Sequence, residues 1–247
     1  MRTIYLSPHL DDAILSAGGL IFEQTRAGLA VEIWSFMCGI PQSNELTDFA
    51  AAMHKLWGTG DAAKTVQIRR DEDREAAALV GAQAVHFDFL DCIYRHGKDG
   101  KGLYADVFVP AHAEDRDLPA QIAQAILARL DAEDVVVCPL TIGKHVDHVL
   151  VRQAAERAMQ AQQSSPSMLR YYADIPYLLN HPEQLDEKTT GMQPVPQAVS
   201  EHAFDIWLKA IESYASQLST LFDDLESMKE RMGEYWRKGK GLQFWQI

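Results

Sequence analysis

The sequence predicts a Rossmann-like α/β fold with three layers (α/β/α), a mostly parallel sheet and a long helical segment at the C-terminus. Two observations point to this fold. Short apolar runs alternate with segments of helical spacing through residues 2–173, which is the order expected of a parallel sheet with helices on both faces. In the last quarter, apolar side chains recur at alternating spacings of four and three residues, which indicates amphipathic helix.

The expected elements follow this alternation from the N-terminus. Strands are expected at residues 2–7, 30–37, 85–90, 135–139 and 168–173, and helices at 12–27, 47–57, 61–81, 118–132 and 148–162. In the first helix, Gly18 and Gly19 indicate a close approach of that helix to the sheet. Region 176–199 contains prolines and is expected to be a loop suited to a lid. Without a linker or repeat, residues 1–247 are expected to form one domain.

The apolar stripe near the C-terminus predicts either one long amphipathic helix or two joined ones. Its members are Trp207, Ile211, Tyr214, Leu218, Leu221, Leu225, Met228 and Met232. Such a stripe packs against the sheet or forms a subunit contact, so a homo-oligomer stays open.

The size, composition and charge of the chain indicate which kinds of partner it can bind. A chain of 247 residues with 47% apolar residues can bury the core of an enzyme. The net charge of -12 argues against a nucleic-acid or anionic-lipid surface and favours a small-molecule substrate. No apolar run is long enough to span a bilayer, and no signal-peptide pattern opens the chain. The three cysteines are expected to be reduced packing residues, and the protein to be cytoplasmic.

Two polar clusters follow two of the expected strands. Ser7-Pro8-His9-Leu10-Asp11-Asp12 comes after the first strand, and His145-Val146-Asp147-His148 follows the strand that ends at Pro139. In an open α/β sheet, ligands bind beyond the carboxyl ends of the strands. His9 and Asp12 are three residues apart at a strand-to-helix turn and can share a divalent metal, with His148 as the third ligand.

Three such ligands leave coordination positions free for water and substrate, which is typical of a catalytic zinc site. Asp11 is then placed to accept a proton from the water, and His145 to donate a hydrogen bond or a proton. Asp147 is expected to orient one of the histidines. Two histidines and a carboxylate also suit non-haem iron, so Fe(II) remains an alternative metal.

Each cluster also has a purely structural interpretation. An aspartate pair that opens a helix is often only a cap, and a histidine at a strand end is often an ordinary hydrogen-bonded residue. The presence of both clusters at two strand ends of one sheet favours the metal site. The sequence contains no G-x-G-x-x-G fingerprint, P-loop or G-x-S-x-G elbow.

The two clusters, together with Gly18-Gly19, resemble the LmbE-like deacetylases related to N-acetylglucosaminylphosphatidylinositol de-N-acetylase. Further agreement comes from Arg70, Asp73, Ala77, Val80 and Gly81, and from Lys209, Ala210, Tyr214, Ser216 and Gln217. The chain departs from the family pattern at Leu10, where proline is common, and at Ala13, where glutamate is common.

The resemblance implies a Rossmann-like zinc enzyme that hydrolyses an N-acyl amide, usually the acetamide of an N-acetylglucosamine unit. By position, it implies zinc ligands at His9, Asp12 and His148, a general base at Asp11 and an acid partner at His145. Arg70 and Asp91 match positions that touch the sugar in relatives, and segment 93–117 is expected to shape the substrate pocket.

The leading hypothesis is a zinc-dependent hydrolase that removes an acyl group from an amino-sugar-containing small molecule, and the resemblance implies that this group is acetyl. One alternative is an amidase that cuts a larger thiol-sugar conjugate. Another is a sugar- or metabolite-binding protein that keeps the metal without turnover, for which Ala13 is the only support.

Overall fold

The computed structural model describes residues 1–42, 45–163, 165, 168–239 and 242–247. Its centre is a seven-stranded sheet with the order β3-β2-β1-β4-β5-β7-β6. Pairing is parallel from β3 to β5 and antiparallel between β5, β7 and β6. The strands are β1 (Thr3–Ser7), β2 (Val31–Ser35), β3 (Gln83–His86), β4 (Val135–Pro139), β5 (Leu169–Tyr172), β6 (Gln193–Pro196) and β7 (Gln243–Gln246).

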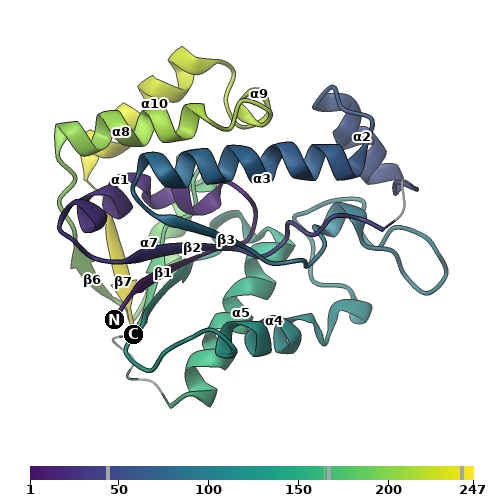
Figure 1. The fold of residues 1–247 in the computed structure, drawn as a ribbon, viewed down its shortest axis with the longest axis horizontal. Coiled ribbons are helices and arrows are strands. Elements are labelled where there is room, and N and C mark those ends of the chain that lie inside the picture. Colours follow the sequence, from purple (N-terminus) through teal and green to yellow (C-terminus); the bar gives the residue numbers. More distant parts are fainter. Residues whose placement is uncertain (43–44, 164, 166–167, 240–241) are drawn as a thin grey trace.

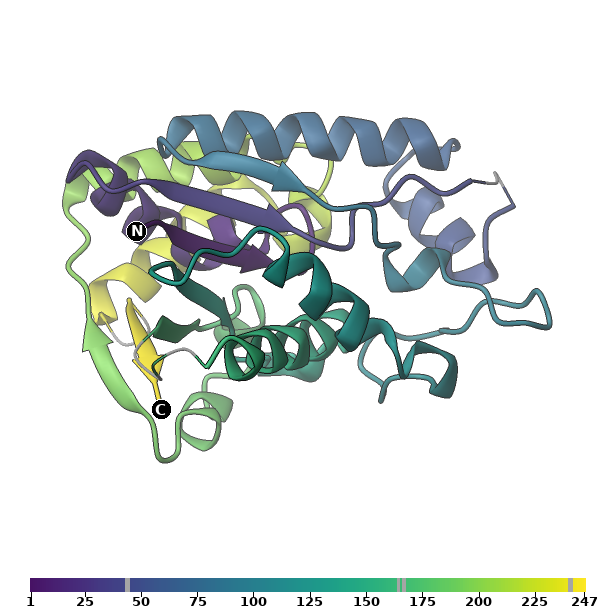
Figure 2. The ribbon, with the colours of Figure 1, turned by 60° about the horizontal axis from the view of Figure 1, so that its bottom comes forward.

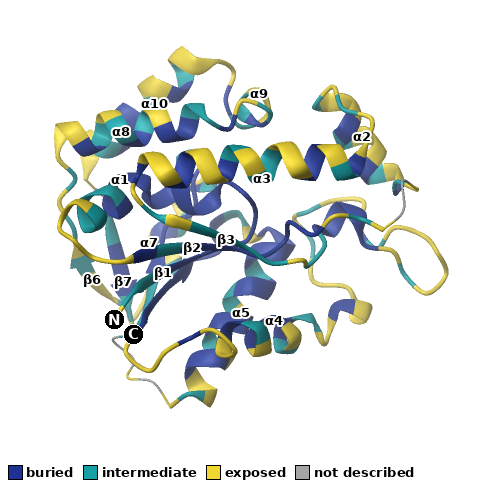
Figure 3. Ribbon diagram, in the orientation of Figure 1, coloured by how far each residue is buried: buried dark blue, intermediate teal, exposed yellow. Residues whose placement is uncertain are grey.

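Helices cover both faces of this sheet (Figures 1 and 2). One face carries α1 (Asp12–Arg26), α3 (Ala62–Leu79) and α8 (Glu201–Glu212), and the other carries α4 (Leu118–Leu127) and α5 (Val146–Ala161). Buried residues alternate with exposed ones along these helices, as expected for helices that cover a sheet (Figure 3). The predicted three-layer α/β/α fold with a mostly parallel sheet is confirmed.

Strand β1 lies in the interior of the sheet, where it pairs with β2 on one side and with β4, the middle strand, on the other. Thr3 is in register with Val31 and with Val135. All five residues of β4 are buried, as expected for a central strand. Because β1 and β4 are parallel neighbours, the loops that leave Ser7 and Pro139 emerge at the same edge of the sheet. The strand order reverses at this pair, and ligands bind in α/β sheets at such a point.

The prediction of a strand at 85–90 is shifted. Strand β3 ends at His86, and beyond it the chain leaves the ladder, with only an isolated bridge between Met37 and Asp88. The expected helix 148–162 starts two residues earlier, at Val146. Both differences lie at element ends, where local pattern is a weak guide.

Region 176–199 is more ordered than the predicted loop. It contains α6 (Tyr177–Asn180), α7 (Gln184–Lys188) and β6. The sequence pattern does not predict β6 and β7, which are four residues long and less apolar than the central strands, and β6 has the proline-containing sequence QPVP. Proline is tolerated there because β6 is the edge strand of the sheet.

The C-terminal stripe is divided into three helices, α8, α9 (Leu218–Leu221) and α10 (Leu225–Lys238), where one or two were expected. Trp207, Tyr214 and Met232 are buried, whereas Leu225 is 48% exposed. Among the described residues, no helix is long and apolar enough to cross a membrane. The three cysteines are buried and form no disulfide, as predicted.

Gly18 and Gly19 allow a close approach, but the partner is helix α8 and not the sheet as predicted. A Cβ atom on Gly18 would overlap the ring of Trp207, and one on Gly19 would lie 2.8 Å from Cγ1 of Val199. Nε1 of Trp207 donates a 2.6 Å hydrogen bond to the carbonyl oxygen of Ile14. The glycines therefore fix the position of α1, whose first turn borders the predicted site.

Candidate metal centre and catalytic cleft

The first turn of α1 leaves the two aspartates of the N-terminal cluster free for chemistry. Asp11 occupies the N-cap position but makes no side-chain capping bond. The hydroxyl of Ser7 accepts from the backbone N–H of Ala13 at 3.1 Å, and Oδ2 of Asp12 accepts from the N–H of His9 at 2.7 Å. The structural interpretation of the aspartates as caps of α1 is therefore not supported.

A strained turn after β4 delivers the second cluster. Thr141, Gly143 and Lys144 all have φ between 61° and 80°. A side chain on Gly143 would lie 2.8 Å from the ring of Tyr177, so glycine is required for two reasons. The turn ends at His145, which caps α5 by accepting a 3.2 Å hydrogen bond from the N–H of Asp147 through Nδ1.

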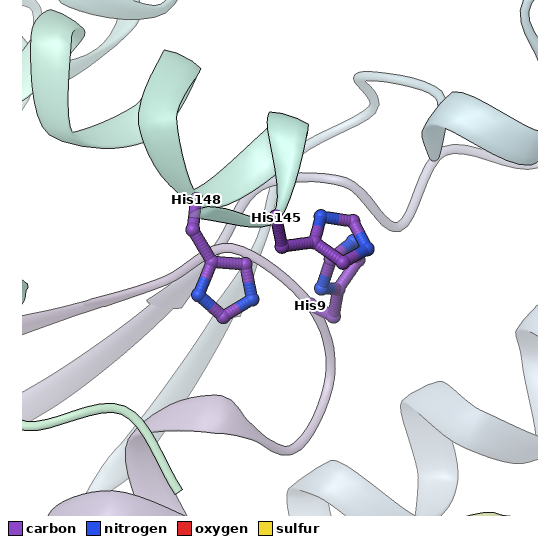
Figure 4. Close-up of side chains that lie close together, drawn as sticks. All are labelled: His9, His145 and His148. Carbon is purple, nitrogen blue, oxygen red and sulfur yellow. The ribbon is translucent and has the colours of Figure 1, made fainter. Parts of the chain in front are cut away.

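Three histidine rings from these two loops converge. The ring centroid of His9 lies 4.7 Å from that of His145 and 5.4 Å from that of His148. Figure 4 shows His145 and His148 projecting from the start of α5 toward the loop that carries His9. One ligand nitrogen of each histidine lies within 4.8 Å of the others, and His9, Asp91 and Asp147 form a second group by the same measure.

Asp12 lies between His9 and His148 and faces both. Its Oδ2 is 3.2 Å from Nδ1 of His9, and its Oδ1 is 3.3 Å from Nε2 of His148. The remaining ring nitrogens face other carboxylates, at 3.2 Å from His9 Nε2 to Asp147 and 2.8 Å from His148 Nδ1 to Asp174. An ionised carboxylate only accepts hydrogen bonds, so each outer ring nitrogen carries a proton, and loss of the second ring proton would leave each inner nitrogen with a lone pair on the side of Asp12.

This arrangement fits a divalent metal. Metal-ligating histidines usually donate their other N–H to a carboxylate, which fixes the tautomer. Nε2 of His148 is buried and has no hydrogen-bond partner in the described part of the chain. His145 is a weaker ligand candidate than Asp12, because its Nδ1 is already used by the helix cap. The ligand nitrogens of His9, His145 and His148 converge, and Asp12 lies within 3.3 Å of His9 and His148.

The pKa values show that the centre attracts positive charge. Burial lowers the pKa of His148, but Asp12 and Asp174 outweigh it and raise that pKa to about 9. Burial likewise opposes ionisation of Asp12, but the charges and hydrogen bonds of His148 and His9 hold its pKa well below the usual range. A cation at this position would replace protons that the two histidines otherwise keep.

Asp11 borders the centre and has the properties of a proton acceptor. Burial, followed by the charge of Asp12, raises the pKa of Asp11 to about 6 against the opposing charges of Arg69 and His9. Its Oδ2 is 3.5 Å from Nη2 of Arg69. A carboxyl with a pKa near neutrality is suited to general base catalysis.

His145 and Asp147 differ sharply in charge. Burial, and then the charges of His9 and His148, keep the pKa of His145 well below its usual range, so its ring is neutral. Because Nδ1 accepts from the helix, the ring proton lies on Nε2, which is free to donate. Asp147 accepts from the N–H of Cys92 at 2.9 Å and is ion-paired with Arg95, and it contacts His9.

The two residues expected to touch the sugar, Arg70 and Asp91, lie in different places relative to the cleft. Arg70 lies outside the cleft, since its guanidinium donates to the carbonyl of Cys38 at 2.8 Å and to Asp88 at 2.6 Å. The neighbouring Arg69 lines the cleft instead, and its Nε is buried without a hydrogen-bond partner in the described chain. Asp91 lies in the cleft, 3.8 Å from Nε2 of His9.

The cleft over the centre has a volume of about 390 Å³. Helix α2 (Asp48–Leu56) and the residue after it form an apolar wall with Phe49, Met53 and Trp57. Segment 93–117 contributes Ile93, Val107 and Phe108, whereas its polar residues Tyr94, Arg95, His96, Lys98, Lys101 and Tyr104 are not among the residues that line the cleft. The cleft therefore combines a charged floor with apolar sides, which is typical of small-molecule sites.

Several site residues could not be found from the sequence. Asp174 follows β5 and had no matched partner nearby in the chain, although its place at a third strand end was a usable signal. In the sequence, Arg95 is only one residue of segment 93–117, and its contact with Asp147 spans 52 residues. Arg69 and Arg70 are adjacent in the sequence, and only the rotation of α3 about its axis decides which of the two side chains lines the cleft.

Comparison with known proteins agrees with this geometry. Residues 4–159 match the family model PIG-L, GlcNAc-PI de-N-acetylase. A 2'-N-acetylparomamine deacetylase of Niallia circulans is 28% identical over 99% of this chain and 93% of its own length. One from Streptomyces fradiae is 30% identical over 71% of this chain and 57% of its own length. The zinc-inhibited form of teicoplanin deacetylase Orf2 superposes with a TM-score of 0.85 at 28% identity, covering 100% and 97% of the two chains.

The fold, the site and these relatives define an enzyme of the deacetylase type, a hydrolase that acts on amide bonds. Since the family model spans more than half of the chain, the protein belongs to the PIG-L family.

Proposed function

We propose that the protein is a zinc-dependent N-deacetylase that removes an acyl group, most simply acetyl, from the amine of an amino-sugar-containing small molecule. The observation that carries this proposal is the position of Asp12 between two histidines whose outer nitrogens are held by carboxylates. The relatives that act on acetylparomamine and teicoplanin support the amino-sugar substrate.

His9, Asp12 and His148 would hold the ion. When bound, zinc lowers the pKa of water toward ~7 and polarises a carbonyl oxygen. Asp11 accepts the proton of the attacking water, because its pKa of about 6 lets it be ionised at neutral pH and still take up a proton. Its place in the cleft beside Asp12 puts it next to the proposed ligands.

His145 stabilises the reacting amide from the other cluster. Its neutral ring donates a hydrogen bond from Nε2 to the carbonyl oxygen as negative charge develops there, and the proton that Asp11 takes from the water is then passed to the departing amine. Asp147 acts through others: it orients His9 and is itself fixed by Arg95. Asp91 and Arg69, both in the cleft lining, are placed to bind sugar hydroxyls.

A substrate screen tests the proposal. Purified protein is incubated with N-acetylated amino sugars, including 2'-N-acetylparomamine and N-acetylglucosamine, and free amine is measured with and without a chelator. We expect amine release from at least one of them and its loss on chelation. Release that persists unchanged after complete metal removal would contradict the metal-dependent mechanism.

Elemental analysis separates zinc from iron. The donor set of two histidines and one aspartate accepts either ion, so the metal content of freshly purified protein decides between them. We expect zinc at about one ion per chain, consistent with three ligands that leave positions free. Bound iron with oxygen-dependent turnover would favour the redox alternative. The cytoplasmic location and a homo-oligomer stay predictions from the sequence.

A further inference from the structure

A second groove adjoins the catalytic cleft, and the two share the ring of Phe108. This ring is 55% exposed, and its centroid lies 6.2 Å from that of His145. The second groove has a volume of about 510 Å³. We call it the basic groove, and its lining includes Phe108, Thr141, Lys144, Arg152, Glu156 and Lys188.

The basic groove is positively charged in a chain whose net charge is -12. Arg152 is neutralised within the groove, because its Nε is 2.9 Å from Oε1 of Glu156. Lys144 and Lys188 make no ion pair in the described part of the chain. Nζ of Lys188 donates one hydrogen bond, at 3.0 Å, to the hydroxyl of Thr141, so two of its three donors stay unused.

The backbone is strained where it presents this charge. Thr141 and Lys144 have φ of 62° and 61°, a region that non-glycine residues seldom adopt. The turn is held by α7, where Oε1 of Gln184 accepts from the N–H of Gly143 at 3.0 Å. Such strain persists where the surroundings enforce it, and it is concentrated at ligand sites. In this turn the strained backbone places Lys144, which makes no ion pair in the described part of the chain, directly before His145.

The positive charges in the groove also affect the pKa of Lys188. Burial, and then the charges of Arg152 and Lys144, lower the pKa of Lys188, while the charges of Asp174 and Glu187 oppose this shift. Positive charges crowded in this way are relieved when an anion binds between them. Phe108 lines both the basic groove and the catalytic cleft, so a single molecule can reach both sites.

We propose that the basic groove binds an anionic group, a carboxylate or a phosphate, that the substrate carries outside the sugar whose amide is cleaved. This inference rests on the proposed deacetylase function for the placement of the sugar. Lys144 and Lys188 supply the charge and the free donors, and Phe108 separates the anion from the reacting amide.

Binding measurements test the groove independently of turnover. Calorimetry compares N-acetylglucosamine with N-acetylglucosamine 6-phosphate and N-acetylmuramic acid, on wild type and on K144Q/K188Q. Charge-assisted hydrogen bonds should make an anionic ligand bind about tenfold more tightly to wild type. The double variant should reduce that preference to within about twofold. A preference for only one of the two anions identifies which chemistry the groove takes.

A matched control removes the same charge elsewhere. K64Q/K229Q replaces two exposed lysines that lie outside the groove and the cleft and should keep the preference. K144Q alone guards against misfolding, because Lys144 is exposed and glutamine can adopt the same backbone, and it should lose part of the preference. Equal binding of neutral and anionic ligands by wild type, no binding of either anion, or a preference retained in K144Q/K188Q overturns the proposal.

Amine release from the same ligands separates the two proposals. If anions bind preferentially and no N-acetyl ligand releases amine, the deacetylase proposal fails for these sugars and the groove stands. If amine is released with equal kcat/KM from neutral and anionic ligands, the groove fails and the deacetylase stands. When both hold, K144Q/K188Q should raise KM for the anionic substrate and leave kcat unchanged.

Discussion

Oδ1 of Asp12 lies 3.3 Å from Nε2 of His148, a buried nitrogen that has no hydrogen-bond partner in the described chain. The opposite nitrogen of the same ring is held at 2.8 Å by Asp174. One carboxylate thus orients the ring toward another. This relationship turns a sequence motif into a candidate metal centre, and it leads to five predictions.

Asp174 should matter for the metal although it is not a proposed ligand. Asp174→Asn keeps the size of the side chain but weakens the acceptor that fixes the His148 tautomer. Loss of such a partner typically costs about 10- to 100-fold in metal affinity. Competition with a chelator of known affinity measures this. Asp205→Asn, an exposed residue of α8, serves as control, and an unchanged affinity in Asp174→Asn would show that the contact does not orient a ligand.

Asp11 should affect turnover and not metal content. Asp11→Asn removes the proposed proton acceptor and leaves His9, Asp12 and His148 in place. We expect kcat to fall about 100- to 10,000-fold, the usual contribution of a general base. Steady-state kinetics and metal analysis of the same preparation give both values. Full activity in this variant would remove Asp11 from the mechanism.

Two adjacent arginines should behave differently. Arg69→Gln alters the cleft lining and should raise KM about tenfold, the loss expected for one charge-assisted contact. Arg70→Gln breaks its bonds to Cys38 and Asp88, so it should lower the free energy of unfolding by about 1 to 2 kcal/mol with KM unchanged. The reverse pattern would restore Arg70 as the sugar contact.

Gly18 should be required for packing. In Gly18→Ala the new Cβ overlaps the ring of Trp207, which is fully buried and bonded to Ile14. Overpacking of this kind costs about 1 to 3 kcal/mol of unfolding free energy. Gly60→Ala is the matched control, because its Cβ meets nothing within 4 Å. Equal denaturant midpoints for the two variants would contradict the proposed α1–α8 contact.

The sequence was sufficient for much of the fold because its strands β1, β2 and β4 are strongly apolar and alternate with periodic helices. It was insufficient where long-range packing decides the structure. Strands β6 and β7 are short, and their nearest ends, Pro196 and Gln243, are 47 residues apart in the sequence, so no local pattern predicts their pairing. The glycines of α1 indicated a close contact, but which element made it depended on where Trp207 folds back.

The candidate site shows the same division. Two motifs at adjacent strand ends gave His9, Asp12 and His148, because topology alone brings those ends together. The residues that orient them came from elsewhere. Asp174 is 26 residues from His148, and Arg95 is 52 residues from Asp147. In the arginine pair of α3, a rotation of about 100° around the helix axis decides which side chain enters the cleft, and a single sequence does not fix that rotation.

Zinc titration of metal-depleted protein tests the central claim most directly. The wild type and Asp12→Asn are stripped with a chelator, titrated with zinc, and assayed for amine release from an N-acetyl amino sugar. We predict that wild-type activity returns and saturates at about one zinc per chain, as for a single catalytic site. We also predict that Asp12→Asn neither binds zinc tightly nor recovers activity. Wild-type turnover that survives stripping, or an Asp12→Asn variant that recovers fully, would contradict the account.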